Sequence, residues 1–344
     1  MNKAGFFTGE SRRVCRRHNS AFSWLHRSVL ALVAGLALLP LTHAQETNWP
    51  SKTVTVVVGF GAGGATDVMA RMASRKLSED LKQPFVVENR VGGAGNVAAT
   101  YVARSAPDGH TLFFAASPQI AATPKIQAVG YDPIADFAPV STFGSGPFIL
   151  VIRPSIPVKT IPQFVDFAKT RNITYGSPGP GSITHLVSAL FLTRAGLEGT
   201  HVPFRSGDQA LVALLGGQID MYFSPIGNIM QYVDSPQLTI LGAASEHRMQ
   251  QLPGVATIGE FYPNTVFSRW NGFLVPAKTP RTIVEKIAKH VILAARDPDN
   301  VAQLKKLGME PGGETPEEFA AQITREQPQF DEAIRAAKLK RESP

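Results

Sequence analysis

The chain has 344 residues, of which 44% are hydrophobic and 18% charged, and its formal net charge is +7. This length and composition suffice for a globular protein of two domains. Six of its 34 basic residues and one of its 27 acidic residues fall in the first 44 positions, so the remainder is nearly neutral. The composition therefore gives no support to nucleic-acid binding, and we expect no nucleic-acid partner.

Residues 1–44 have the pattern of an export signal. Basic residues precede the apolar run VLALVAGLALL (29–39), and small residues lead to Ala44, where we expect cleavage. The apolar run is short for a membrane span, which needs about 20 residues. The segment SRRVCRR (11–17) resembles a twin-arginine signal only loosely, so the export route stays open. Since the single cysteine, Cys15, lies in this segment, we expect no disulfide in the mature chain.

From Trp49 onward, short β-branched runs alternate with helical patterns. TVTVVV (53–58) predicts a strand, and apolar residues at helical spacing predict a helix from Thr66 to about Lys82. Strands are also expected at 84–88 and 110–116, with a helix at 92–106 between them. This βαβαβ order indicates a parallel sheet covered by helices.

A second α/β unit and a helix-rich end follow. The patterns predict strands at 148–154, 173–177, 220–224 and 238–245, helices at 161–170, 182–195 and 208–217, and further helices after Thr279. In open α/β sheets, ligands bind outside the carboxyl ends of the strands. The glycine-rich loops 59–65 and 176–182 fall at such positions, one in each unit.

The first loop, GFGAGG (59–64), is compatible with several interpretations. Its glycines let the backbone approach a ligand, and the helix that follows, capped by Thr66 or Asp67, directs free N–H groups toward an anion. The same glycines spell the G-x-G-x-x-G fingerprint of dinucleotide-binding turns, with Glu88 where the ribose acid is expected. A tight turn without a ligand also fits. Because Asp67 would repel an anion, its expected role is to hold loop amides in place.

The second loop, YGSPGPGSITHL (175–186), has the same physical character. Glycines follow a strand, and Ser182 stands at the start of a helix, where it is either a plain N-cap or part of an anion site. His185 is either a ligand contact or a helix-face histidine packed against a neighbour. Two such loops facing each other would offer backbone amides to both ends of a small anion.

Catalytic and metal-binding patterns are weak. No two of the histidines after Ala44 lie within four residues of each other, so a helical metal pair is absent. There is no G-x-S-x-G elbow and no Walker lysine. Arg205 is either a carboxylate partner or a solvated surface residue. We expect no catalytic residue, no metal and no cofactor.

Several blocks of the chain together resemble the tripartite tricarboxylate transporter substrate-binding proteins, the Bug or TctC-like receptors. The resemblance covers the chain from about Trp49 and rests on blocks in a fixed order: WPSKTVTVVVGFGAGGATDVMAR, VENRVGGAGNVAATYVARSAPDGHTL, YDPIADFAPV, YGSPGPGSITHL, ALLGGQIDMYFSP, LPGVATIGE and WNGFLVPAKTP. It implies an α/β fold of the type II periplasmic-binding-protein (Venus-flytrap) class. Each lobe would be a mostly parallel sheet flanked by helices, with 45–145 plus 271–344 forming lobe 1 and 146–270 lobe 2.

The resemblance also implies a function without catalysis. The protein would be a monomeric periplasmic receptor that captures a small carboxylate (a di- or tricarboxylate, an acidic amino acid or an aromatic acid). It would deliver this ligand to the membrane subunits of a tripartite tricarboxylate-type transporter. Two alternatives stay open: an oxidoreductase that uses NAD at the Gly59–Gly64 turn, and a ligand-binding partner of a signalling system.

The ligand-binding residues that the resemblance implies come from both loops and from nearby strand ends. They are Phe60, Ala62, Gly63, Gly64, Ala65, Thr66, Asp67, Ser117, Ser177, Gly179, Gly181, Ser182, Thr184, His185, Arg205 and Ser224. Several positions depart from the family pattern. Relatives typically carry proline in place of Gly59 and commonly also in place of Gly61 and Ala62. They carry Asp in place of Ser224 and Lys-Gly in place of Arg205-Ser206. These departures bear on the ligand's identity.

Overall fold

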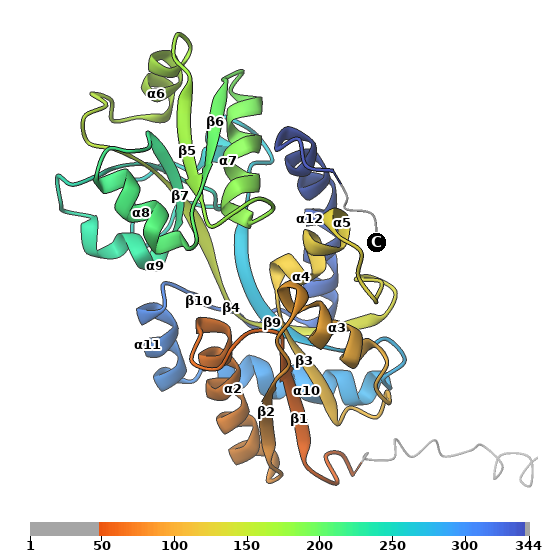
Figure 1. Ribbon diagram of the computed structural model, residues 1–344. Helices are drawn as coiled ribbons and strands as arrows, with labels where there is room; N and C mark the ends of the chain where they lie inside the picture. Colours follow the sequence, from red (N-terminus) through yellow and green to blue (C-terminus); the bar gives the residue numbers. More distant parts are fainter. Residues whose placement is uncertain (1–47, 341–344) are drawn as a thin grey trace, which may run out of the picture. The chain divides into compact units, whose positions relative to one another are not determined.

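A computed structural model describes residues 48–340 (Figure 1). The predicted export signal falls in residues 1–47, outside the described part. The strands form one sheet in the order β2-β1-β3-β9-β4-β7-β5-β6, with β10 and β8 also paired to β4. The strands are β1 (Val54–Val58), β2 (Phe85–Asn89), β3 (Thr111–Ala116), β4 (Phe137–Ile152), β5 (Ile173–Ser177), β6 (Gly199–Pro203), β7 (Met221–Pro225), β8 (Thr239–Ala243), β9 (Ser268–Pro276) and β10 (Glu310–Pro311).

Helices connect these strands in an alternating α/β order, as the sequence patterns predict. The α-helices are α2 (Ala65–Leu81), α3 (Asn96–Ala103), α4 (Ser117–Ala121), α5 (Thr123–Ile126), α6 (Ile161–Ala168), α7 (Ile183–Arg194), α8 (Gly207–Leu215), α9 (Ile226–Ile229), α10 (Arg281–Ala295), α11 (Pro298–Lys306) and α12 (Pro316–Ala336). Short 3₁₀ turns lie at Gly93–Gly95, Met230–Tyr232 and Ile258–Glu260. Within residues 48–340, no helix is long and apolar enough to cross a membrane.

Two groups of parallel strands are joined by long antiparallel ones. β1 pairs in parallel with β2 and β3, and β5 pairs in parallel with β6 and β7. β4 pairs with β9 along Phe137–Pro147 and with β7 along Phe148–Ile152, so this one strand takes part in both groups. The α/β class predicted from the sequence is confirmed, with β4 and β9 as its continuous link.

Apolar side chains cover both faces of each parallel group. Beside β1, Val56 packs in a cluster with α2 and α10, whereas Val57 packs on the other face with α3. This is the alternation expected of a strand with helices on both sides. The two clusters around β4, β5 and β7 are likewise separate, one including α7 and the other α8. Each glycine-rich loop therefore emerges from a strand that is fixed on both faces.

The second predicted helix is shorter than its sequence pattern indicates. Residues 92–106 were expected to be helical, but α3 spans only Asn96–Ala103. Gly92, Gly93, Ala94 and Gly95 all have positive φ angles, which an α-helix cannot accommodate. Glycines permit this left-handed entry, so the run GGAG forms a turn before the helix.

Helix α12 packs against residues from both parts of the sheet. Its first half contributes Phe319 and Ile323 to the cluster around Trp270, and its second half contributes Phe330 to the cluster that contains Phe267. Trp270 Nε1 donates a 3.0 Å hydrogen bond to Glu326 Oε2. Burial raises the pKa of Glu326, and the hydrogen bonds from Trp270 and Gln322 offset only part of this effect.

Replacing Glu326 by glutamine is expected to stabilise the protein at high pH. Since the pKa of Glu326 is raised in the folded state, its stabilising contribution is present below the unfolded pKa and is lost as pH rises through the folded pKa. Glu326→Gln still accepts the Trp270 hydrogen bond and avoids burying a charge. We expect its unfolding free energy to exceed the wild type's by about 1 kcal/mol at pH 8. Urea denaturation at pH 4 and pH 8 measures this.

The exposed Glu198 provides the control, because Glu198→Gln changes the same group outside the core. An equal gain in both variants, or a gain for Glu326→Gln that does not depend on pH, would contradict the account.

Candidate ligand-binding site

The first loop is organised around the buried carboxylate of Asp67. This carboxylate accepts hydrogen bonds from Gly63 N (2.9 Å), Arg71 Nε (3.0 Å) and Asn89 Nδ2 (2.9 Å). Burial alone would raise the pKa of Asp67, but the hydrogen bonds from Arg71, Gly63 and Asn89 outweigh it and hold the pKa below its usual value. Asp67 is thus an ionised internal anchor of the loop, the role favoured by the sequence.

Asn89 is a second anchor that sequence reasoning missed. Its Nδ2 donates to Phe60 O at 2.9 Å as well as to Asp67, and its Oδ1 accepts from Arg71 at 3.2 Å. Its position directly after the run PFVVE was the only signal that could have found it. Phe60 is half-buried and packs partly against the apolar cluster beside β1.

The start of α2 has backbone donors without acceptors in the described part of the chain. The prediction that Thr66 or Asp67 caps this helix is wrong: the N-cap is Gly64, which has no side-chain acceptor, and the helix begins at Ala65. Asp67 cannot cap it because its carboxylate is engaged by the loop and by Asn89. Among residues 48–340, no hydrogen-bond acceptor is found for the N–H groups of Ala65, Thr66 and Asp67. Gly61, Ala62, Gly63, Gly64 and Ala65 are exposed, so a ligand can reach this helix end.

Asn271 connects Thr66 with the end of β3. Its buried Nδ2 lies 3.3 Å from Thr66 Oγ1 and 3.4 Å from Ala115 O. Ser117 follows two residues after Ala115 and is fully buried, and its Oγ has no partner within the described residues. Thr66 and Ser117, two of the predicted site residues, therefore belong to one neighbourhood, and Asn271 is a member that the sequence did not reveal.

The second loop uses several of its own groups internally. Ser177 Oγ accepts the Gly179 N–H at 3.0 Å, Ser182 Oγ donates to Gly179 O at 2.7 Å, and Gly181 N–H donates to His185 Nδ1 at 3.1 Å. Gly179 and Gly181 have φ angles of 122° and 78°, which favour glycine. Ser182 is the N-cap of α7. The amides of Gly179 and Gly181 are therefore held by the protein in this structure.

His185 lies in an aromatic stack with His201 and Tyr175. The His185 and His201 rings are 3.8 Å apart, and the His201 and Tyr175 rings 5.3 Å. His201 Nε2 lies 2.7 Å from Ser177 Oγ. Burial and the neighbouring His201 lower the pKa of His185 to about 4. His185 is therefore neutral at physiological pH and accepts the Gly181 hydrogen bond through Nδ1.

The remaining predicted residues are placed differently. Thr184 is buried in the first turn of α7, with its Oγ1 3.3 Å from Ser182 Oγ. Ser224 is buried on β7, and its Oγ lies 3.3 Å from Pro225 O. Arg205 is exposed, and within residues 48–340 its one hydrogen bond is from its backbone N–H to Gln209 Oε1 at 3.2 Å. Arg205 is thus the least integrated member of the predicted set.

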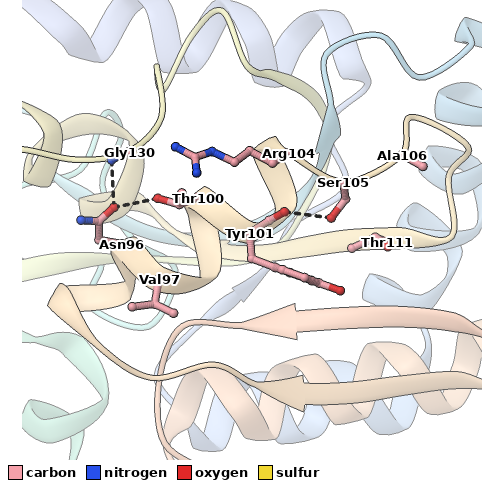
Figure 2. A pocket seen from close by; sticks show the side chains of 9 residues that line it. All are labelled: Asn96, Val97, Thr100, Tyr101, Arg104, Ser105, Ala106, Thr111 and Gly130. Atoms are coloured by element: carbon pink, nitrogen blue, oxygen red, sulfur yellow. Dashed lines mark hydrogen bonds between the residues drawn. The ribbon is translucent and has the colours of Figure 1, made fainter.

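A hollow of about 750 Å³ lies away from both loops. Figure 2 shows the residues that line it, which come from α3 and the segment 104–106 after it, together with Thr111 at the start of β3 and Gly130. Thr111 is at the opposite end of β3 from Ser117, so this hollow is not the loop site. Between Asn48 and Lys340 no group of three or more His, Cys, Asp or Glu side chains is arranged to hold a metal.

Two of the solved structures that this chain resembles hold adipate and malate. A protein of R. palustris solved with adipate has a TM-score of 0.70 and is 30% identical, and the match covers 86% of this chain and all of that one. MatC from Rhodopseudomonas palustris, solved with bound malate, has a TM-score of 0.65 and is 29% identical, over 83% of this chain and all of that one.

The family follows from the sequence match. The model described as the tripartite tricarboxylate transporter family receptor, TctC, matches residues 69–339. An UPF0065 protein encoded in the tcbD-tcbE intergenic region of Pseudomonas sp. strain P51 is 34% identical over 86% of this chain and 89% of its own length. The chain therefore belongs to the tripartite tricarboxylate transporter receptor family, whose members are periplasmic solute-binding receptors and not enzymes. The family match begins just after the first loop.

Asp67→Asn is expected to destabilise the protein. The substitution removes an ionised acceptor and places an NH₂ group opposite the donors on Gly63 and Asn89. We expect a loss of about 2 kcal/mol in unfolding free energy at pH 7, measured by urea denaturation. Asp299→Asn, at an exposed position in the first turn of α11, is the matched control. Losses of equal size in the two variants would show that Asp67 is not the anchor.

His185→Asn is expected to flatten the dependence of stability on pH. Because the folded-state pKa of His185 is depressed to about 4, the unfolded chain binds more protons between about pH 6.5 and pH 4, and stability falls as pH is lowered through this window. This contribution is at most about 3 kcal/mol. Asparagine retains an acceptor for Gly181 but does not titrate.

Denaturation at pH 4, 5, 6 and 7 measures the effect, with the exposed His247→Asn as the control. If the wild type and His185→Asn lose stability in parallel, His185 does not titrate in this way.

Proposed function

We propose that the protein is a periplasmic receptor that captures one small carboxylate between its two glycine-rich loops. It then delivers the ligand to the membrane subunits of a tripartite tricarboxylate-type transporter. The observation that carries this proposal is the start of α2, where three N–H groups without acceptors in the described chain lie beside an exposed loop. Family membership and the relatives solved with adipate and malate support it.

The chemistry of the α2 end suits a carboxylate. Free N–H groups at a helix N-terminus carry partial positive charge and point at an incoming anion. Since Asp67 already fixes Gly63, the loop does not have to be ordered by the ligand, which lowers the entropic cost of binding. We expect micromolar or tighter affinity, on the order of −8 kcal/mol.

We further propose that the ligand is enclosed by two lobes, 45–145 with 271–344 and 146–270, acting as a monomer. The pairing of β4 with β9 in its first part and with β7 in its second part supports this division. One glycine-rich loop follows a strand of each parallel group. In this proposal Ser177, Ser182 and Thr184 bring hydroxyl groups to the ligand from the second loop, and Ser117 and Ser224 contribute from the strand ends.

The dinucleotide alternative is disfavoured by the local packing of its fingerprint. A Cβ on Gly59 would lie 2.8 Å from Gly95 Cα and 2.5 Å from Gln119 Nε2, so this glycine is required by contacts within the protein. Glu88 forms an ion pair with Arg90 at 2.7 Å. Both residues have structural partners, and neither needs a cofactor to account for it. A role in signalling would use the same ligand site and differ only in the docking partner.

Ala65→Pro tests the proposed amide site. Ala65 is the first residue of α2, where proline is tolerated, and Gly64 before it is extended (φ −72°, ψ 162°), as a residue preceding proline requires. The substitution removes one N–H and leaves the helix intact. We expect carboxylate affinity to fall about 10- to 100-fold, as measured by calorimetry with succinate, malate and adipate.

Ala65→Ser keeps the N–H and serves as the control. Unchanged affinity in Ala65→Pro would exclude this amide from the site. A thermal shift of the wild type by NAD, with none by any of these acids, would overturn the receptor function itself.

A further inference from the structure

Arg269 is a cation on the face of β9 that packs on the same side of the sheet as α2, the helix that follows the first loop. Trp270 points to α12, where its ring packs 4.9 Å from that of Phe319. Because side chains alternate along a strand, Arg269 and Asn271 share the opposite face. Asn271 lies within hydrogen-bonding distance of Thr66 at the start of α2. Arg269, two positions before Asn271, is therefore the next residue along the same face of β9.

The guanidinium of Arg269 has no anionic partner in residues 48–340. Its Nη2 lies 3.0 Å from Met309 Sδ, a weak acceptor. Burial is the only cause that lowers the pKa of Arg269, without any contribution from an acidic group. By contrast, Arg153 and Arg194 pair with Asp220 and Glu332. Arg269 thus carries a desolvated charge that the described chain does not compensate.

Arg269 also lies close to the link between the two strand groups. Its partner on β4 is Gly146, two residues before Phe148, and Phe148 pairs with Pro225 beside Ser224 on β7. The side chain is surrounded by protein but remains partly accessible. A solute that reaches the α2 end can therefore approach the guanidinium from the same side.

We propose that Arg269 is the counter-ion for a second acid group of the ligand, which is therefore a dicarboxylate. This inference rests on the proposed function: one carboxylate would bind the amides of Ala65 and Thr66, and the other would form a bidentate pair with Arg269. A planar guanidinium suits a carboxylate in this way. An unpaired cation buried in protein is costly, and a ligand dianion removes that cost on binding.

Calorimetry with matched acids tests the proposal. The probes are succinate, glutarate and adipate, each paired with the monocarboxylate of equal length (butyrate, pentanoate and hexanoate). We expect the wild type to prefer at least one diacid about 100-fold over its monoacid. Arg269→Gln reduces that preference to near unity, because it lowers the affinity for the diacid and leaves the affinity for the monoacid unchanged. Arg269→Lys retains part of the preference. The melting temperature of free Arg269→Gln stays equal to or above that of the wild type, because no structural ion pair is lost.

Arg75→Gln, at an exposed position on α2, removes a positive charge elsewhere and should leave the preference unchanged. If Arg269→Gln keeps the wild-type preference, or if the wild type binds each monoacid as tightly as its diacid, the role of Arg269 is overturned while the receptor function stands. The second comparison needs no variant, so it decides the question even if Arg269→Gln does not fold. Absence of binding by every one of these acids to the wild type would overturn the receptor function and, with it, the role of Arg269.

Discussion

The hydrogen bonds accepted by the buried carboxylate of Asp67 determine the geometry of the first loop. Gly63, Arg71 and Asn89 all donate to this group, and together they keep it ionised against the cost of burial. Since Asp67 is occupied in this way, it cannot cap α2, and Gly64 supplies no side chain to do so. Within residues 48–340, the amides at the start of the helix therefore have no side-chain cap. A negative residue close to a proposed anion site thus serves to expose positive dipoles.

The two glycine-rich loops differ in how they distribute their donors. Within the described part of the chain, the amides of Ala65 and Thr66 beside the first loop have no acceptor, whereas those of Gly179 and Gly181 in the second loop donate to Ser177 and His185. The hydroxyl groups of Ser177 and Ser182 in the second loop form hydrogen bonds with Gly179, beside the buried His185. In the proposed receptor, the first loop contributes oriented dipoles and the second contributes adaptable polar contacts. The identity of the ligand then depends on side chains around both loops.

The sequence predicted the class of fold and the two loops because both follow from local patterns. Alternating β-branched and helical segments indicated the parallel groups, and glycines at strand ends indicated the loops. Asn89 and Asn271 were not predicted as site residues, because each is engaged by partners distant in sequence. The predicted cap of α2 was wrong for the same reason, because the sequence GGATD does not reveal that Asn89 and Arg71 form hydrogen bonds with Asp67. Of the three glycines that spell G-x-G-x-x-G, Gly59 is explained by its packing against Gly95 and Gln119.

The central claim, that a carboxylate binds at the start of α2, can be tested by NMR on ¹⁵N-labelled protein titrated with adipate. A hydrogen bond to an anion shifts the amide proton of its donor downfield. The account predicts that the signals of Ala65 and Thr66 move in this direction and saturate together with binding, while the Gly63 amide, already bonded to Asp67, changes little. Saturable binding of adipate that leaves the Ala65 and Thr66 amides unshifted would contradict it.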